Sequence, residues 1–163
     1  MIGAHEWRKK GVLVPALGDL SHPFYGVYSP VRGEYLELVQ KAPLPAVMTT
    51  AFEIGAGTGG TTSHLLPALD ALATEYDFTD VSPLFLAKAK RKFAAYPFVR
   101  YALLDIEKEP QAQGFEPQRY DVILAANVLH ATQDLKVTLG HVRRLLAPQG
   151  ALRTHRATRA LAV

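Results

Sequence analysis

From Val47 onward, the hydrophobic and polar positions of the chain follow two periods in turn. Short runs rich in β-branched and aromatic residues, typical of buried strands, are each followed by a segment whose apolar residues recur every three or four positions, which is typical of helices. The predicted strands are 47–54, 75–80, 98–105 and 120–126, with a fifth beginning at Ala151. The predicted helices are 61–73, a helix opened by Ser82-Pro83, and 134–147.

Strands that alternate with helices at this spacing predict an α/β fold with a parallel sheet and helices on both faces. In such sheets, ligands bind outside the carboxyl ends of the strands, where the strand order reverses. Acidic and polar residues fall at those predicted ends: 53–60, Asp80, Asp105 and 127–130. The pattern therefore predicts a ligand site at that edge of the sheet.

Three local features make the helix predictions more specific. Pro67 is an awkward interior residue, so the first helix should kink there or begin late. Ser82 and Pro83 supply an N-cap and a proline at the first helical position. The last predicted helix has apolar residues on one side, which we expect to line its packed face: Leu135, Leu139, Val142 and Leu146.

The first part of the chain has a different composition. Residues 1–45 hold five of the eleven prolines and little periodic pattern, and only Val31–Lys41 reads as a helix. We interpret 1–45 as an N-terminal extension or linker with one helix, and 46–163 as the ligand-binding core.

Composition excludes several classes of protein and partner. The 163 residues fit one domain, and no apolar run approaches the roughly 18 residues of a membrane-spanning helix, so we expect no membrane partner. The absence of cysteine excludes disulfides and thiolate metal sites and is compatible with a cytoplasmic protein. No histidine or carboxylate pair has metal-ligand spacing, so we predict no metal. The net charge is only +3, and we interpret the basic clusters as solvated helix faces without a nucleic-acid partner.

Three glycines, Gly55, Gly57 and Gly59, lie between an apolar strand and a helix, and glycine allows a ligand to approach the main chain closely. Their spacing is G-x-G-x-G, but Gly60 can complete the dinucleotide fingerprint G-x-G-x-x-G. The loop alone therefore leaves three interpretations open: a dinucleotide site, a site for another nucleotide-like ligand, or a tight turn without a ligand. Glu53 favours a ligand that carries an ammonium and a sulfonium, because it would repel the phosphates of a dinucleotide.

Three further polar residues follow predicted strands. Asp80 can accept both hydroxyls of a ribose, and its structural alternative is to cap the helix opened by Ser82. Asp105 can accept a hydrogen bond from an adenine amino group, and its alternative is a surface turn. His130, three residues after Asn127, can serve as a base near neutral pH, although a structural or exposed histidine is the simpler interpretation of spacing alone.

The stretch FEIGAGTGGTT at 52–62 resembles the first motif of class I S-adenosylmethionine-dependent methyltransferases. More narrowly, the chain resembles the C-methyltransferase domains of modular and iterative polyketide synthases. Three further stretches carry this resemblance: YDFTDVSPLF at 76–85, LDIE at 104–107 and AANVLHAT at 125–132. The resemblance implies a Rossmann-like fold and S-adenosylmethionine as the cofactor.

The resemblance also implies a reaction and a set of site residues. The reaction is methylation of the α-carbon of a β-ketoacyl thioester held on an acyl carrier protein, with neighbouring polyketide synthase domains as further partners. In such domains, a histidine in the position of His130 removes the α-proton. The positions implied to bind the cofactor are Glu53, Gly55, Ala56, Gly57, Gly59, Asp80, Val81, Asp105, Ile106 and Asn127.

The sequence departs from the family after Gly150. The family continues with an apolar strand ending in a glutamate that orients the histidine, and Arg156 occupies that place here. A cation there would depress the proton affinity of the histidine. The chain ends at Val163, so we expect a shortened fold that lacks the last two strands. Two alternatives stay open: an inactive methyltransferase that serves as a binding or structural module, and a dinucleotide-dependent oxidoreductase.

Overall fold

The structure, a computed structural model, describes residues 12–14, 19–21, 48–69 and 75–155. The chain divides into two compact units, Met1–Leu38 and Val39–Val163. In the first unit, strands β1 (Val12–Val14) and β2 (Asp19–Ser21) pair antiparallel. The sequence pattern did not predict this pair, because strands of three residues are too short to establish a period. The helix predicted at 31–41 lies outside the described residues.

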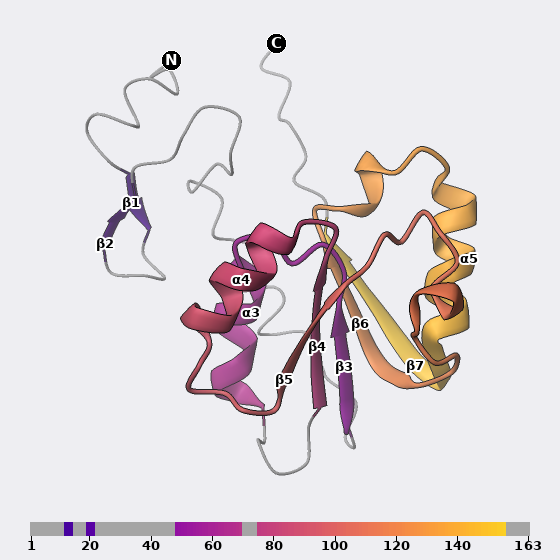
Figure 1. Cartoon of the computed structure of the whole chain (residues 1–163), viewed down its shortest axis with the longest axis horizontal. Coiled ribbons are helices and arrows are strands. Elements are labelled where there is room, and N and C mark those ends of the chain that lie inside the picture. Colours follow the sequence, from indigo (N-terminus) through magenta and orange to yellow (C-terminus); the bar gives the residue numbers. More distant parts are fainter. Residues whose placement is uncertain (1–11, 15–18, 22–47, 70–74, 156–163) are drawn as a thin grey trace. The chain divides into compact units, whose positions relative to one another are not determined.

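The second unit contains a five-stranded parallel sheet with the strand order β5-β4-β3-β6-β7 (Figure 1). The strands are β3 (Thr50–Glu53), β4 (Glu75–Asp80), β5 (Val99–Leu103), β6 (Tyr120–Ala126) and β7 (Leu146–His155). The chain starts at the centre with β3, runs outward to β5, and then returns to place β6 on the other side of β3. The predicted parallel α/β sheet is confirmed, and the strand order reverses between β3 and β6.

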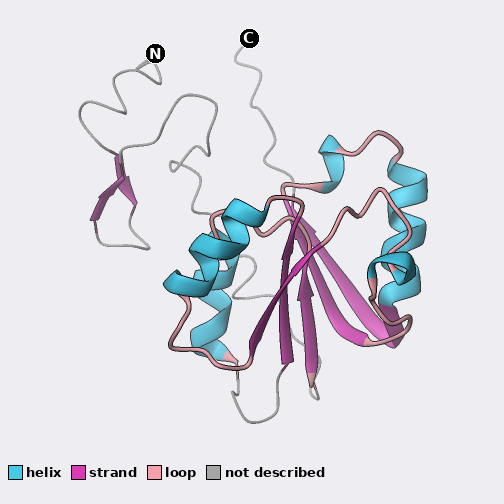
Figure 2. Ribbon diagram, in the orientation of Figure 1, coloured by secondary structure: helices cyan, strands magenta, loops and turns pink. Residues whose placement is uncertain are grey.

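Helices cover both faces of this sheet, as Figure 2 shows. On one face, α3 (Gly60–Leu65), the 3-10 turn η1 (Leu66–Ala68) and α4 (Pro83–Lys92) pack on a core that includes Ala51 and Phe78. On the other face, α5 (Leu135–Leu145) packs on a core that includes Phe52 and Ile123. Adjacent residues of β3 thus belong to opposite cores, because successive side chains of a strand point to opposite faces. No described helix has the length and apolar composition needed to cross a membrane.

The predicted packed face of α5 is confirmed for Val142, which is buried, and for Leu146, which packs against the same core, but not for the other two leucines. Leu135 and Leu139 are 49% and 39% exposed, whereas the buried residues of the helix are Thr138, His141, Val142 and Leu145. Two polar residues can be buried because both are hydrogen bonded: the Thr138 hydroxyl donates to Asp134 O (2.9 Å), and His141 Nδ1 lies 2.7 Å from Ile106 O. These bonds favour a rotation of the helix that the positions of its leucines did not indicate.

Two further boundaries differ from the prediction. The first helix does not kink at Pro67 but ends at Leu65, and Pro67 lies in the 3-10 turn that follows. Strand β7 begins at Leu146 rather than at Ala151. A Cβ at Gly150 would lie 2.6 Å from Tyr120 O, so this glycine lets the chain pass close to the backbone of β6, where the strand register shifts.

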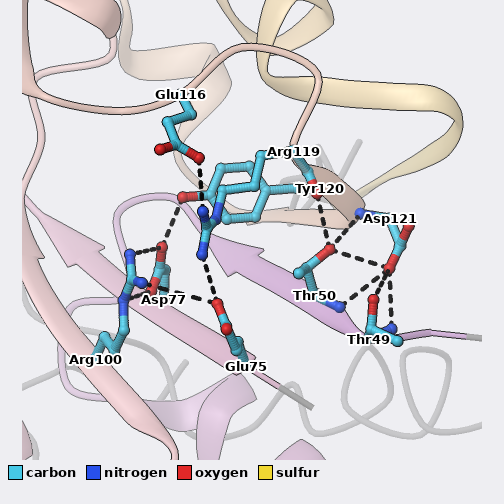
Figure 3. Close-up of polar contacts among 9 residues, drawn as sticks. All are labelled: Thr49, Thr50, Glu75, Asp77, Arg100, Glu116, Arg119, Tyr120 and Asp121. Atoms are coloured by element: carbon cyan, nitrogen blue, oxygen red, sulfur yellow. Dashed lines mark hydrogen bonds and ion pairs between the residues drawn. The ribbon is translucent and has the colours of Figure 1, made fainter. Parts of the chain in front are cut away.

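A polar cluster joins the strands at the amino-terminal end of the sheet (Figure 3); Asp77 and Tyr120 are buried in it, and Arg100 and Glu75 are exposed. Asp77, which is 3% exposed, accepts a hydrogen bond from Tyr120 Oη (2.6 Å), and its Oδ1 lies 2.8 Å from Arg100 Nε. Arg119 reaches across the same edge to Glu75, with Nη2 and Oε2 2.6 Å apart. Burial and the bond to Asp77 hold the pKa of Tyr120 well above its usual value, so the phenol stays a donor.

Asp121 fixes the start of β3 against the start of β6. Its Oδ2 accepts hydrogen bonds from the backbone N–H and the hydroxyl of both Thr49 and Thr50, at 2.9 to 3.1 Å. Burial opposes the charge of Asp121, but these four bonds outweigh it and lower the pKa of the carboxyl. The polar residues at this edge are therefore engaged with one another, and the predicted site lies at the opposite edge.

Candidate cofactor site

The glycine loop that follows β3 has a backbone available mainly to glycine. Gly55, Gly57 and Gly59 have φ of 60°, 55° and 72°, in the left-handed region. A Cβ at Gly55 would lie 2.6 Å from Val128 Cγ2, and one at Gly59 would lie 2.6 Å from the Phe93 ring. At Gly57 the nearest atom would be 3.9 Å away. The loop is therefore packed at both ends and open at its middle glycine.

Glu53, the last residue of β3, has its carboxyl buried between β4 and α3. The residue is 2% exposed, and Oε2 accepts hydrogen bonds from Thr62 Oγ1 and Tyr76 Oη, both at 2.5 Å. Burial raises the pKa of Glu53 from 4.5 to about 7, although both hydrogen bonds and the charge of Lys92 lower it. The Glu53 carboxyl is therefore buried behind the glycine loop and hydrogen bonded to the protein.

Lys92, at the end of α4, holds the outer part of the glycine loop. Its Nζ donates to Thr58 O (3.0 Å) and Gly59 O (3.3 Å). Burial lowers the pKa of Lys92, and the charge of Glu53 opposes this effect. Sequence reasoning missed this residue, because it treated the basic run of α4 as a solvated face and nothing in the spacing distinguishes Lys92.

Asp80 lies at the carboxyl end of β4 beside the open middle of the loop. Its Oδ2 accepts a hydrogen bond from Gly57 N (2.9 Å) and its Oδ1 accepts one from Ser82 N (2.8 Å). Ser82 is the N-cap residue of α4, as predicted, but its own side chain makes no capping bond. Val81 is 68% exposed, and Leu103, the register partner of Asp80 on β5, is 53% exposed. A carboxylate therefore adjoins exposed apolar surface here.

The loop after β5 carries Asp105 and Ile106. Asp105 Oδ2 lies 3.0 Å from Lys108 Nζ, and Oδ1 accepts from Glu107 N (3.1 Å). The hydrogen bond from Lys108 is the largest cause of a lowered Asp105 pKa. The Ile106 side chain is 5% exposed and belongs to the core under α5. Any contact of Ile106 with a ligand would therefore have to come from its backbone.

Gln113, in the 3-10 turn η2 (Gln111–Gln113), shapes this loop and was missed from the sequence. Its Oε1 accepts from Asp105 N (2.8 Å), and its Nε2 donates to Asp105 O (2.9 Å) and to the carbonyls of Lys108 and Glu109 (both 3.3 Å). One amide side chain thus satisfies four backbone groups. No motif or period marks Gln113, so the sequence offered no signal for this role.

The segment after β6 brings Asn127 and His130 to the same edge. Asn127 has φ of 59° in the left-handed region, and His130 is exposed in the 3-10 turn η3 (Leu129–Ala131). Val128, between them, lies against Gly55. Because β3 and β6 are parallel neighbours, this segment and the glycine loop adjoin each other at their carboxyl ends. The fold therefore gathers the predicted site residues at one edge, with the side chains of Glu53 and Ile106 buried behind it.

These residues suit an adenosyl ligand. The open approach at Gly57 suits a ligand lying against the main chain, and the Asp80 carboxylate can accept hydroxyl groups. The exposed side chains of Val81 and Leu103 offer apolar surface to a ring. An adenosyl group bears hydroxyls and an aromatic base, so the residues fit it.

Comparison with known proteins identifies the class. Residues 52–152 match the family model described as "Methyltransferase domain". The chain belongs to this methyltransferase family, and its fold is that of the class I S-adenosylmethionine-dependent methyltransferases. The resemblance seen in the sequence is confirmed, and the dinucleotide alternative receives no support.

Within this class, the chain is similar to the carbon methyltransferases of polyketide synthases. It is 53% identical over 140 residues to the highly reducing polyketide synthase pspA of Penicillium soppii, a match that covers 83% of this chain and 6% of that protein. The crystal structure of the CurJ carbon methyltransferase is 55% identical with a TM-score of 0.67, and the match covers 78% of this chain and 34% of that one. The trans-methyltransferase CalH, solved in complex with SAH, is 47% identical with a TM-score of 0.62, and the match covers 74% of this chain and 34% of that one.

Proposed function

We propose that this chain methylates the α-carbon of a β-ketoacyl thioester carried on an acyl carrier protein. The observation that carries the proposal is the position of His130, which is exposed at the carboxyl end of β6 in a segment that adjoins the glycine loop through Val128. The similarity to the pspA polyketide synthase and to the CurJ carbon methyltransferase supports this class of substrate. The acyl carrier protein and neighbouring polyketide synthase domains are the proposed partners.

In this proposal, the cofactor lies along the carboxyl ends of β3, β4 and β5. When bound, S-adenosylmethionine supplies an electrophilic methyl group on a sulfonium. The Asp80 carboxylate accepts the ribose hydroxyls; its oxygens have lone pairs beyond those used by Gly57 N and Ser82 N. Val81 covers the base, and Asp105 accepts from its amino group. The remaining positions proposed to bind are Glu53, Gly55, Ala56, Gly57, Gly59, Ile106 and Asn127.

His130 is the proposed base. The α-carbon of a β-ketothioester lies between two carbonyl groups, so its proton is acidic enough for an imidazole, whose ordinary pKa is near neutrality. A ring nitrogen of His130 would accept that proton, and the electron pair left on the α-carbon would form the new bond to the methyl group while the methyl–sulfur bond breaks and its electrons remain on sulfur as a neutral thioether. Because His130 is exposed, a substrate arriving from outside the sheet edge can reach its ring.

The inactive-methyltransferase alternative depends on Arg156 and on chain beyond Val163, both outside the described residues. Among the residues that the structure describes, nothing favours it: the glycine loop, Asp80 and His130 are together at one edge. The comparisons point to methyltransferases as well.

The test is turnover by the chain with S-adenosylmethionine and a β-ketoacyl pantetheine thioester, free and loaded on a carrier protein. Mass spectrometry should detect the α-methylated product. Deuterium exchange at the α-carbon, measured without cofactor, isolates the proton-removal step. We expect His130→Ala to abolish both signals while calorimetric cofactor binding remains.

His64→Ala is the matched control. His64 lies on α3, with Nδ1 3.0 Å from Gly60 O, and has no proposed part in proton removal. It should leave α-carbon exchange unchanged. Methylation that persists in His130→Ala would refute the assigned base, and cofactor binding without any turnover by the unaltered chain would favour the inactive module.

A further inference from the structure

The buried Glu53 carboxyl has a hydrogen-bond arrangement that suits both of its protonation states. Thr62 Oγ1 and Tyr76 Oη both donate to the same carboxyl oxygen, Oε2. A neutral carboxyl can therefore keep its proton on Oε1 while Oε2 accepts both hydroxyls, and an ionised one can keep the same two bonds. The proton can leave without any rearrangement of these partners.

Charged groups of opposite sign face Glu53 from the elements around it. Lys92, from α4, favours the ionised carboxyl, and Asp80, at the end of β4, disfavours it. The partners on α3 and within β4 are the uncharged hydroxyls of Thr62 and Tyr76. Burial and these groups together set the pKa of Glu53 at about 7, so a further charge near the loop will change its protonation at neutral pH.

A ligand on the glycine loop brings such a charge. Glu53 is separated from Gly55 by one residue, and Asp80, which acts on Glu53 electrostatically, is hydrogen bonded to Gly57 N. S-adenosylmethionine carries an ammonium and a sulfonium, whereas the thioether left after methyl transfer carries only the ammonium. Inside a protein, such charges interact more strongly than in water.

We propose that Glu53 releases its proton when a cationic methyl donor binds on the glycine loop, and that this ionisation makes the site prefer the sulfonium donor over its neutral thioether product. Glu53 is in this view a specificity-determining residue that acts from behind the loop. The inference rests on the proposed function, because it takes S-adenosylmethionine as the ligand.

Proton linkage gives the expected size and sign of the pH dependence of ligand affinity. Glu53 is protonated more in the free protein than in the complex, so affinity for S-adenosylmethionine rises with pH. If binding lowers the pKa by roughly one unit, the affinity rises about fivefold between pH 6 and pH 8, and roughly 0.4 proton is released at pH 7. S-adenosylhomocysteine should show a smaller rise and a smaller release.

The test is calorimetric titration of the 163-residue chain with each of the two ligands. Measurements at about pH 6, 7 and 8, in two buffers of different ionisation enthalpy, give the affinity and the number of protons released. Glu53→Gln keeps an oxygen that can accept from Thr62 and Tyr76 but removes the titration. It should flatten the pH dependence and reduce the preference for S-adenosylmethionine. Glu116→Gln, an exposed carboxylate that pairs with Arg119, is the matched control and should behave like the unaltered chain.

Thr62→Val provides a second test if Glu53→Gln does not fold. It removes a hydrogen bond that lowers the pKa of Glu53, so the pH dependence should move to higher pH. The ammonium of the ligand titrates equally in all variants, so only differences between variants count. A pH dependence and proton release that neither variant changes would overturn the inference and leave the proposed function intact. Failure of the unaltered chain to bind either ligand would instead overturn the proposed function.

Discussion

The ring of Phe93 packs directly against Gly59: a Cβ on that glycine would lie 2.6 Å from Phe93 Cε2. Phe93 is the C-cap residue of α4, and Gly59 is the N-cap residue of α3. Lys92 adds a hydrogen bond to Gly59 O at the same place (3.3 Å). The conformation of the glycine loop therefore depends on where α4 ends.

This contact predicts that Gly59→Ala costs more stability than the same change at Gly57. Both glycines have left-handed backbones, which costs alanine roughly 1–2 kcal/mol. Only Gly59 adds a clash with Phe93, and overpacking costs about 1–3 kcal/mol more. Urea denaturation of the two variants should reveal the difference. Phe93→Leu combined with Gly59→Ala should recover only the part of the stability loss that the clash causes. Equal losses of stability at the two glycines would refute the packing argument.

The two helix N-caps predict unequal effects of alanine. Asp134 Oδ1 accepts from Lys136 N (2.8 Å) and Val137 N (3.0 Å), so Asp134→Ala should cost about 1 kcal/mol. Ser82 makes no capping bond with its side chain, so Ser82→Ala should stay within about 0.5 kcal/mol of the unaltered chain. Thermal unfolding of both variants checks this. A larger loss at Ser82 than at Asp134 would contradict the observed caps.

Glu53 predicts a fall in stability as pH rises from 4.5 to 7. The folded pKa of about 7 lies above the ordinary value of 4.5, so below 4.5 the carboxyl is protonated in both states and stability is greatest. Between the two values, only the unfolded chain releases the proton, and the free energy of unfolding drops by up to about 3 kcal/mol. Above pH 7 the loss is constant. Urea denaturation across this range should show the drop, and Glu53→Gln should remove that part of it.

Gln113 predicts a local loosening of the loop after β5. Gln113→Ala leaves the N–H of Asp105 without its partner, which should cost about 1–3 kcal/mol, whereas the Asp105 carbonyl keeps the hydrogen bond from Lys108 N (3.0 Å). Hydrogen exchange should accelerate at the Asp105 amide. Gln111→Ala, an exposed neighbour in the same 3-10 turn, is the control and should not change exchange there. Unaltered exchange in Gln113→Ala would show that the loop does not depend on this amide.

Much of the sheet could be predicted from the sequence because its strands are marked locally. β4 and β6 have the predicted bounds, since each is a nearly continuous run of residues buried on both faces. The glycine loop and Asp80 were found because a strand, a glycine spacing and a later acid follow one another at recognisable distances. Such signals lie within a short stretch of sequence, so they can be read without the fold.

The features that could not be predicted from the sequence depend on contacts between residues far apart in the chain. His141 is buried in α5 against the carbonyl of Ile106, 35 positions earlier, and Lys92 bonds to Thr58, 34 positions earlier. Periodicity places Leu139 on the inside of α5, but those distant bonds decide how the helix is turned. The same limit hid Gln113, whose role appears only when the loop is folded around it.

Asp121 also bears on how the chain folds. Its carboxylate joins Thr49 and Thr50 to the start of β6 across about 70 positions of sequence, and β3 and β6 form the point at which strand order reverses. The β3–β4–β5 half can form from neighbouring segments, whereas β6 must close a long loop before it pairs with β3, which is slow on entropic grounds. The hydrogen bonds to Asp121 stabilise that closure once β6 has paired with β3. The side chain therefore favours the slowest pairing of the sheet, although it lies at the end of the strands opposite the candidate site.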